Sequence, residues 1–445
     1  MTISRINDNS LHIGKRIKHL NHCFTKWSGL YCLSFYCLLF SVFYPSFISG
    51  QNIDFNRNLL GNADKIIIPY SYHQGFIIVD VVFQRLLPLK FILDTGAEHT
   101  IILKREYVDA LNLKSSKRIR IYGSDMSKEL YALIYRNTFL QMANTQMVRH
   151  DVIVLEEDML LLEEYVGTNV DGILGAEFFK GMILQIDYKK QQIILYNPSL
   201  FDYSKITGHQ KLDLEVSAGK PYLMCTTEIV EGTAIQTRLL VDTGAALTVL
   251  FHNNTDSLLI IPELIVKGNL GKGLGGEIEG FTGKVHRLQI DGLEFRNMLS
   301  SFQDLDDILI EESKVKRNGI IGNLLLERFN VVFDFHKLNL YLKPGKNYNK
   351  AFKFDKSGLT VFAFGKELNQ YYVKYVMDSS PAAEAGILPG DIIRKVGIWS
   401  TRWFSLSSLN KKLMGKTGKK ITLTLERDGQ KLKKEIILRD LFERN

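Results

Sequence analysis

The feature that most constrains the fold of this chain is a tetrapeptide that occurs twice. Asp94-Thr95-Gly96-Ala97 follows an apolar run at 91–93, and Asp242-Thr243-Gly244-Ala245 follows a similar run at 239–241. In each copy a strand-like run ends in a tight turn that contains glycine and presents a carboxylate. The matched pair predicts two halves that each contribute one aspartate to a shared site.

Two further landmarks repeat at the same distance. Gly172-Ile173-Leu174-Gly175 matches Gly319-Ile320-Ile321-Gly322, and Asp187 and Asp334 lie in similar apolar segments. The two turn aspartates are 148 positions apart, and the other two pairs of landmarks are each 147 positions apart. This near-constant spacing indicates an internal duplication. Two units are too few for a solenoid, so we expect two similar lobes that face each other.

The first 50 residues are typical of a segment that directs export. Residues 1–26 hold five basic side chains against one acid, Asp8, and they run into the apolar stretch 30–43 and then Pro45 and small residues. This order predicts a signal peptide. The alternative is an uncleaved N-terminal membrane anchor with the basic tail inside the cell. Both alternatives predict an exported protein in the periplasm or cell envelope, or a secreted one.

Charge and cysteine usage agree with this prediction. Half of the formal net charge of +8 lies in residues 1–26, so the excess does not form a basic patch in a folded domain, and no nucleic-acid partner is expected. Three of the four cysteines lie in the leader, and only Cys225 remains after it. The mature chain therefore has no internal disulfide, which fits a bacterial envelope. Cys225 lies in an apolar run and is expected to be a core residue.

The remaining chain is long enough for two or three domains. Short runs rich in Ile, Val and Phe, separated by turn residues, predict mostly strands in both halves. The acidic segment 156–164 is expected to be a short amphipathic helix, and 343–351 a polar linker. The expected organisation is all-β, with a first lobe at 51–205, a second lobe at 206–342, and a small α+β domain at 352–445.

Two aspartates held close together suit acid–base chemistry. Like charges raise the pKa of one carboxyl group strongly, so the pair shares a proton over a useful pH range. One carboxylate can then take a proton from water while the other, protonated, polarises a substrate carbonyl. We therefore predict Asp94 and Asp242 as the catalytic pair. Thr95 and Thr243 are expected to hydrogen-bond across the lobe interface and to fix the two turns.

At these residues the chain resembles the pepsin- and retropepsin-type aspartic peptidases. Both Asp-Thr-Gly-Ala turns and both Gly-apolar-apolar-Gly segments resemble elements of that family, over roughly residues 65–342. The resemblance implies a bilobal β fold with the cleft between the lobes and a polypeptide substrate in the cleft. It looks like a retropepsin dimer fused into one chain, which implies that a monomer is sufficient for activity.

Two details refine the resemblance. Ala97 and Ala245 stand where pepsin-like enzymes usually have a hydroxyl residue, so the sequence predicts a pH optimum less acidic than that of pepsin. Each half also offers a candidate flap that would close over a peptide. The candidates are Tyr122-Gly123 in the first half and the glycine-rich segment 271–276, with Gly273, Gly275 and Gly276, in the second. The alternative for Tyr122 is an ordinary strand aromatic.

The C-terminal unit resembles a PDZ domain, on the segment 380–393 with its Ala385-Gly386 and Gly390-Asp391. By resemblance, the peptide-binding loop is Ser357-Gly358-Leu359-Thr360, which departs from the family's usual Gly-Leu-Gly-Phe. A ligand would add as a strand beside 359–364. The alternative is a docking or autoregulatory module that binds no peptide.

The sequence thus predicts an exported, single-chain aspartic endopeptidase with a PDZ domain that binds a peptide or protein partner. No metal and no organic cofactor is implied, and contact with a membrane is expected only through an uncleaved leader. The alternative from another class is a catalytically inactive scaffold that holds peptides in the cleft and the PDZ domain. A second alternative is an anchored sheddase.

Overall fold

The computed structural model describes residues 57–122, 129–157, 161–273, 276–305 and 316–442. The chain separates into two units, 1–53 and 54–445, and only the second contains described residues. The predicted leader therefore lies outside the described residues. Within the described ranges, no helix is long and apolar enough to cross a membrane.

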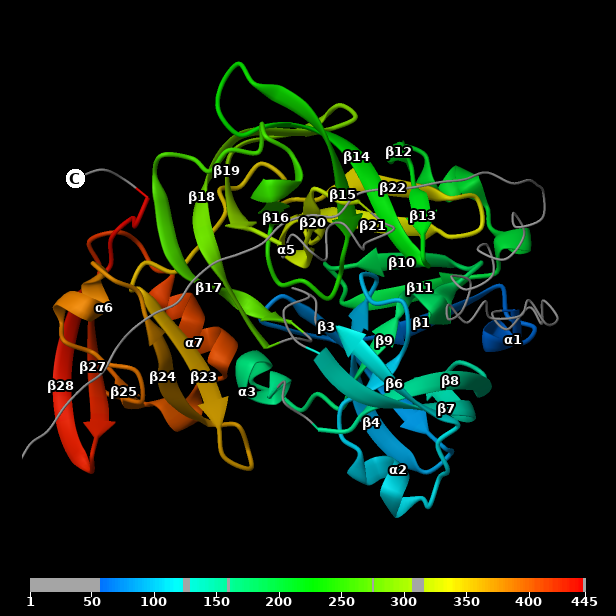
Figure 1. The fold of residues 1–445 in the computed structure, drawn as a ribbon, viewed down its shortest axis with the longest axis horizontal. Helices are drawn as coiled ribbons and strands as arrows, with labels where there is room; N and C mark the ends of the chain where they lie inside the picture. Colours follow the sequence, from blue (N-terminus) through cyan, green and yellow to red (C-terminus); the bar gives the residue numbers. More distant parts are fainter. Residues whose placement is uncertain (1–56, 123–128, 158–160, 274–275, 306–315, 443–445) are drawn as a thin grey trace, which may run out of the picture. The chain divides into compact units, whose positions relative to one another are not determined.

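Each half of the duplicated region forms one eight-stranded sheet (Figure 1). In sheet order, the first half contributes β2 (Ser71–His73), β3 (Phe76–Phe83), β4 (Leu87–Asp94), β9 (Gly172–Gly175), β5 (Ile101–Ile102), β8 (Val148–Leu155), β7 (Glu129–Met142) and β6 (Lys117–Tyr122). The second half contributes β13 (Glu215–Ser217), β14 (Lys220–Glu228), β15 (Ala234–Val241), β20 (Gly319–Ile321), β16 (Val249–His252), β19 (Leu293–Gln303), β18 (Gly276–Ile290) and β17 (Ile265–Gly273). The two orders correspond strand for strand, so the predicted duplication is confirmed.

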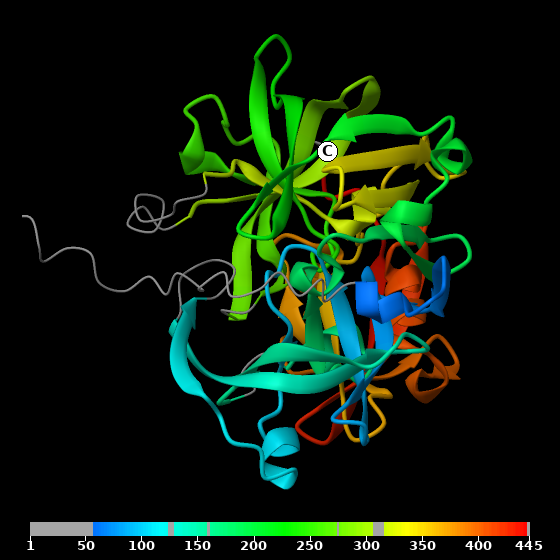
Figure 2. The same cartoon turned by 90° about the vertical axis from the view of Figure 1, so that its right-hand side faces the viewer.

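A third sheet joins the two halves. It runs in the order β1 (Lys65–Pro69), β11 (Gln192–Tyr196), β10 (Ile183–Asp187), β21 (Phe329–Asp334), β22 (Asn339–Pro344) and β12 (Gln210–Asp213). At its centre β10 pairs antiparallel with β21, so one ladder of hydrogen bonds crosses from the first half to the second. Both strands are mostly apolar because both faces of this sheet are covered by buried clusters. Figure 2 shows the two halves above and below this junction.

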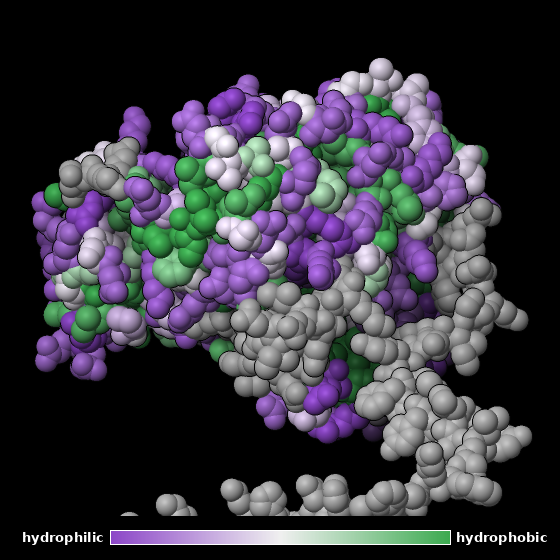
Figure 3. All heavy atoms as spheres, turned by 45° about the horizontal axis from the view of Figure 1, so that its top comes forward, coloured by the Kyte–Doolittle hydropathy of each residue, from purple (hydrophilic) through white to green (hydrophobic). Residues whose placement is uncertain are grey.

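One hydrophobic core runs through both halves, with Phe83, Phe91, Phe251 and Phe302 among its largest fully buried side chains. Burying these rings supplies the main driving force for packing the sheets together. Hydrophilic side chains predominate on the face in Figure 3, and apolar ones gather in separate groups. The few helices between strands are short: α1 (Arg57–Leu60), α2 (Glu106–Ala110), α3 (Leu162–Val166) and α5 (Asn323–Leu326).

Three local elements differ from the expectations. In the acidic segment, where residues 158–160 lie outside the described residues, helix α3 begins at Leu162, directly after Leu161 in a left-handed conformation (φ 43°). The sequence predicts a strand at 130–135, and β7 is much longer because its far end also pairs with β3. The short helix α2 was not anticipated, since its five residues carry no clear apolar period.

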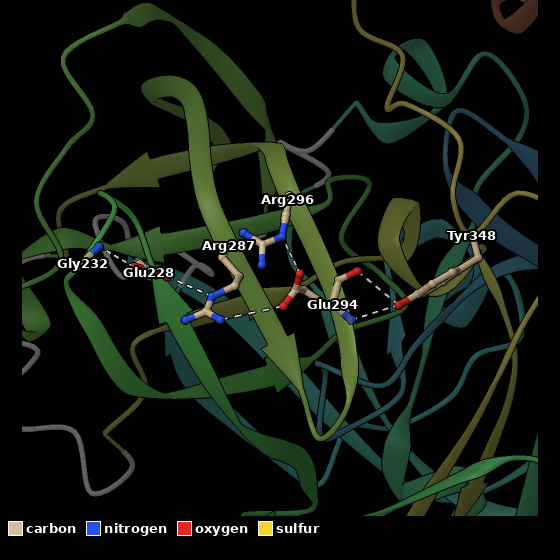
Figure 4. A network of polar contacts seen from close by, with 6 residues as sticks. All are labelled: Glu228, Gly232, Arg287, Glu294, Arg296 and Tyr348. Carbon is tan, nitrogen blue, oxygen red and sulfur yellow. Dashed lines mark hydrogen bonds and ion pairs between the residues drawn. The ribbon is translucent and has the colours of Figure 1, made fainter.

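The polar segment at 343–351 is held against the second half rather than left free. The Tyr348 ring centroid lies 5.1 Å from that of Phe295, and the Tyr348 hydroxyl accepts a hydrogen bond from the Glu294 backbone N–H at 2.9 Å (Figure 4). In the same view, the Glu294 carboxylate lies between Arg287 and Arg296, at 3.8 and 2.6 Å. These contacts fix where the chain leaves the duplicated region.

The C-terminal domain is a small α+β unit with its own core. Its sheet has the order β23 (Leu359–Phe364), β24 (Gln370–Val376), β25 (Ile392–Val396), β27 (Lys420–Arg427) and β28 (Gln430–Ile437), with β26 (Trp399–Ser400) beside β25. The helices are α6 (Pro381–Glu384) and α7 (Leu406–Leu413). Ser380 caps α6, and its Oγ accepts the Ala383 N–H at 3.2 Å. The predicted fold class, all-β lobes followed by a small α+β domain, is confirmed.

Candidate active site

The two aspartates occupy equivalent positions at the ends of strands. Asp94 is the last residue of β4, which pairs in parallel with β9 so that Asp94 lies opposite Gly175. Asp242 directly follows β15, which pairs in parallel with β20. The Gly-apolar-apolar-Gly segments thus lie beside the strands that carry the aspartates. This arrangement gives each turn a rigid support in the middle of its sheet.

The two turns are tied to each other by four buried hydrogen bonds. Thr95 N–H donates to Thr243 Oγ1 at 3.0 Å, and Thr243 N–H donates to Thr95 Oγ1 at 3.1 Å. Each hydroxyl then donates to a backbone carbonyl of the opposite half, Val241 O at 2.7 Å and Leu93 O at 2.8 Å. The expected hydrogen bonds between Thr95 and Thr243 are confirmed. They bring two turns that are far apart in sequence into direct contact.

The glycine in each turn leaves room for the opposite carboxylate. A Cβ added at Gly96 would overlap the carboxyl group of Asp242, and one added at Gly244 would overlap that of Asp94. The two carboxyl groups face each other across this gap, and the negative charge of Asp94 contributes to the pKa shift of Asp242. The turns therefore need glycine at this position because the partner's carboxylate fills the space that a side chain would take.

The surroundings of the two carboxylates differ. Asp94 Oδ1 accepts the backbone N–H groups of Gly96 and Ala97, both at 2.8 Å. Asp242 Oδ1 accepts only that of Gly244 among the described donors, at 2.7 Å. Backbone N–H donors stabilise the ionised form. The first half therefore favours a charged carboxylate more than the second half does.

The pKa shifts of the two carboxyl groups differ in the same direction as their backbone donors do. Burial raises the pKa of Asp94, and the hydrogen bonds from Asp242, Ala97 and Gly96 oppose that rise. Burial raises the pKa of Asp242 well above its usual range, and the negative charge of Asp94 and the hydrogen bond to it add to the rise. Together with the additional backbone donor at Asp94, these directions favour a proton on Asp242 and an ionised Asp94.

A cleft of about 380 Å³ opens above the pair. Its walls are mostly apolar, with contributions from both halves, among them Phe76, Ile101, Tyr165, Leu240 and Leu250. Four charged or titratable side chains besides the aspartates also line it: Glu98, His99, Lys220 and Arg317. Apolar walls that surround a few polar groups are typical of a ligand site.

Sequence reasoning missed these four polar residues. Glu98 and His99 directly follow the first Asp-Thr-Gly-Ala turn, whereas Lys220 and Arg317 are placed by the pairing register of the duplicated strands. Register assigns Lys220 to the position of Phe76, because β3 and β14 pair equivalently with the strands that carry the aspartates.

Both candidate flap regions lie on hairpins that reach the cleft. Ile121, in the hairpin β6–β7, lines it, as do Leu270, Gly271 and Ile278 in the hairpin β17–β18. Tyr122 ends β6, and Gly273 pairs with Gly276 at the end of the second hairpin. Gly123 and Gly275 lie outside the described residues. The flap role of these residues stays a prediction.

In the C-terminal domain, the predicted peptide-binding loop is already occupied by a side chain of its own chain. Asp355 Oδ1 accepts the backbone N–H groups of Ser357 at 2.9 Å, Gly358 at 2.5 Å and Leu359 at 3.3 Å. Burial raises the pKa of Asp355 to about 6. Three of the four residues of the predicted loop, Ser357, Gly358 and Leu359, thus direct their N–H donors to Asp355. Thr360 is the second residue of β23, and it lines a separate pocket with Asp355.

Helix α3 contacts both the cleft and the C-terminal domain. The Tyr165 ring lies 5.9 Å from that of Phe76 in the cleft and 5.4 Å from that of Phe362 in β23. The Tyr372 hydroxyl donates to Glu164 Oε2 at 3.0 Å. The C-terminal domain therefore supports one wall of the cleft through Tyr165.

The remaining predicted features are simpler. Cys225 is free and buried, as expected of a core residue, and burial raises the pKa of its thiol to about 12. Within the described part of the chain, no group of three or more His, Cys, Asp or Glu side chains could hold a metal ion.

Two parts of the chain match known protein families. Residues 79–178 match the family model described as aspartyl protease, and residues 353–438 match that of the PDZ domain. A curated protein described as a probable CtpA-like serine protease, from Staphylococcus saprophyticus, is 42% identical over 139 residues. That match covers 31% of this chain, and it spans only 27% of the length of the relative.

A solved structure, the aspartic proteinase from Irpex lacteus, is 13% identical with a TM-score of 0.40, and the match covers 64% of this chain and 99% of that one. From the family matches, the chain carries an aspartyl protease domain and a C-terminal PDZ domain.

Proposed function

We propose that this chain is an aspartic endopeptidase in which Asp94 and Asp242 together activate one water molecule. The observation that carries the proposal is the geometry of the pair: two carboxyl groups, each in the space opposite the other half's turn glycine, at the base of a largely apolar cleft. The crossed threonines hold both turns in place, so the pair is preorganised before substrate binds. Peptide hydrolysis at such a pair needs no covalent intermediate.

The difference between the carboxyl groups assigns their roles. Asp94, with two backbone N–H donors, begins ionised and takes a proton from the water. As the water oxygen bonds to the carbonyl carbon, Asp242 gives its proton to the carbonyl oxygen, and a neutral diol forms. Asp94 then passes its proton to the leaving nitrogen, the C–N bond breaks, and a diol hydroxyl returns a proton to Asp242. The starting protonation is restored in each cycle.

One relative is described as a serine protease, a catalytic type different from the aspartic type proposed here. In the described part of this chain, no serine hydroxyl hydrogen-bonds to a histidine ring. A threonine, Thr100, does contact His150 at 2.9 Å, but its side chain is fully buried and does not line the cleft. These contacts favour the aspartate pair.

The catalytic type is tested with a probe that reacts only with an activated serine. Digestion of an unfolded protein should continue unchanged after long incubation with a fluorophosphonate, because water rather than a serine attacks the peptide bond. Mass spectrometry of the treated protein should show no added label. Loss of activity together with labelling of one serine would move the chemistry away from Asp94 and Asp242.

The alanine after each turn glycine should set the acid limit of activity. Replacing Ala97 or Ala245 with serine places a hydroxyl beside a carboxylate, and a hydrogen bond to the ionised form lowers its pKa. The acid limb of the pH profile of kcat/KM should therefore move to lower pH, by up to about one unit for a hydrogen bond of about 1 kcal/mol. The same substitution at Ala143, which lies outside the cleft lining, serves as control. An acid limb that stays fixed or moves to higher pH would refute this assignment.

Export and the PDZ domain complete the proposal. The basic and apolar leader favours export, and N-terminal sequencing of the mature protein would show whether it begins near Gln51. The PDZ domain is proposed to bind a peptide or protein partner. Because Asp355 occupies the donors of the predicted loop, such a partner would not need a free C-terminal carboxylate.

A further inference from the structure

The duplication allows the two sides of the cleft to be compared position by position. In the first half, Ile78 of β3 pairs with Ile92, two residues before Asp94. In the second half, Tyr222 of β14 pairs with Leu240, two residues before Asp242. Two positions before these strand residues lie Phe76 and Lys220, which both line the cleft. One half thus presents an aromatic ring where the other half presents an amine.

A second position repeats this difference. Arg317 lies two residues before Gly319 in β20, and the equivalent residue before Gly172 in β9 is Val170. Val170 is fully buried and apolar, whereas Arg317 lines the cleft. The charge of Arg317 lowers the pKa of Asp242 in opposition to burial. The second half therefore carries basic side chains at both positions where the first half carries apolar ones.

Lys220 faces several charged groups but is not held in an ion pair. In the part of the chain that the structure describes, no carboxylate lies within 4.0 Å of its ammonium group. Burial and the charge of Arg317 lower the pKa of Lys220, and Glu98, Asp94 and Asp242 act in the opposite direction. A partly buried amine that pairs with none of the described carboxylates can still bind an anion.

Glu98, whose charge raises the pKa of Lys220, has contacts of its own. A Cβ at Gly219, next to Lys220, would lie 3.3 Å from Glu98 Cγ, so the turn between β13 and β14 packs against Glu98. The Glu98 carboxylate lies 3.8 Å from His99 Nε2, and His99 Nδ1 contacts Glu177 at 2.7 Å. Glu98 thus contacts His99 in the first half, and the Glu98 carboxylate forms no ion pair with the Lys220 ammonium.

On the premise that the chain is a peptidase, we propose that Lys220 is a specificity-determining residue that binds a carboxylate of the substrate beside the scissile bond. Arg317 adds positive potential on the same side, and the apolar wall around Phe76 receives a hydrophobic side chain on the other. The favoured substrate is a peptide with an acidic group on one side of the cleavage point and an apolar residue on the other. The acidic group is either a Glu or Asp side chain or the C-terminal carboxylate of a short peptide.

Matched peptides test this proposal. Internally quenched peptides that differ only by Glu or Gln are scanned through the positions flanking the cleavage point, and short peptides are compared with free and amidated C-termini. The parent should cleave the Glu peptide about tenfold faster than the Gln peptide in kcat/KM at one position, because a charge-assisted contact is gained. A preference confined to the free C-terminus would identify the terminal carboxylate as the bound group.

The variant Lys220→Met keeps the apolar stem and removes the charge, so its Glu-to-Gln ratio should fall to about one. The ratio is measured within each variant, so any change in the pKa values of the aspartates cancels. Turnover of the Gln peptide shows that Lys220→Met is folded. Lys190→Met, at an exposed lysine in the turn between β10 and β11, should retain the parent ratio.

The outcomes separate the two proposals. Cleavage without a charge preference in the parent, or a preference that survives in Lys220→Met, overturns the role of Lys220 and leaves the peptidase assignment intact. The same peptides are also titrated against the Asp94→Asn variant by fluorescence anisotropy. Tighter binding of the Glu peptide, lost in Asp94→Asn combined with Lys220→Met, supports the carboxylate site even if the parent cleaves nothing, a result that would overturn the peptidase assignment alone.

Discussion

Replacing Asp94 with asparagine should lower kcat/KM for an unfolded protein substrate by about 10³-fold, and Asp242→Asn should do the same. An amide in place of Asp94 removes the base that takes a proton from water, and one in place of Asp242 removes the proton donor to the carbonyl oxygen. Positioned acid–base groups contribute about 10² to 10⁴-fold each. Asp213→Asn, at an exposed strand position outside the cleft, should retain the parent rate. The measurement is a steady-state digest across the pH range.

The thermal stability of Asp242→Asn tests the raised pKa of Asp242 separately from activity. Because burial raises the pKa of Asp242 in the folded state, the folded protein holds a proton that the unfolded chain releases once pH exceeds the usual Asp pKa of 3.8. The free energy of unfolding therefore falls as pH rises from there toward the raised pKa. Asp242→Asn removes this loss, so its Tm at pH 7 should exceed that of the parent, with a smaller difference near pH 3.

Equal cleavage by the parent and both asparagine variants would contradict the assignment of the aspartate pair. No cleavage by a folded parent at any pH would instead favour the scaffold alternative, in which the cleft and the PDZ domain hold peptides without hydrolysing them. A Tm at pH 7 that falls in Asp242→Asn would show that the carboxyl group stabilises the fold, contrary to its raised pKa.

Adding one methyl group at Gly244 should have an effect of similar size by a different route. The new Cβ would overlap the Asp94 carboxyl group, so Gly244→Ala must push the two turns apart. Overpacking at a buried site costs about 1–3 kcal/mol in the free energy of unfolding. A displacement of about 1 Å at a reacting group costs about 10²-fold in rate. Gly96→Ala should behave alike, because its Cβ would meet the Asp242 carboxyl group.

The matched control is Gly268→Ala in β17. A Cβ there would have its nearest neighbour, the methyl of Met377, at 3.7 Å, which is an ordinary contact. This variant should keep parent activity and lose little stability. Full activity of Gly244→Ala would show that catalysis does not require the close approach of the two turns. Activity and the urea midpoint are measured on the same preparations, so a rate effect can be separated from unfolding.

Several features of the site could be predicted from sequence because they are local and occur twice. Asp94 and Asp242 each follow an apolar strand, and the same spacing to a second glycine segment repeats in both halves. Chance would not reproduce nearly the same spacing in three pairs of landmarks, so the repeat itself supports the prediction of a paired site. The hydrogen bonds between Thr95 and Thr243 followed from the same symmetry.

Other features depend on contacts that no local pattern encodes. Lys220 lies beside the aspartates only because β14 pairs with β15 in a particular register. Tyr165 reaches the cleft because α3 begins at Leu162, after a left-handed residue that the acidic run did not signal. The filling of the predicted PDZ loop by Asp355 depends on a side-chain conformation rather than on residue type.

The joining of both halves in one chain allows the two walls of the cleft to differ. In a symmetric dimer of identical subunits, every residue that lines the cleft appears twice, so a lysine at this position would face its own copy. Here the third sheet and the threonine contacts hold the halves together, while Phe76 and Lys220 differ. Because both halves belong to one chain, the two walls are not required to be alike. Each wall can therefore match its own side of an asymmetric ligand.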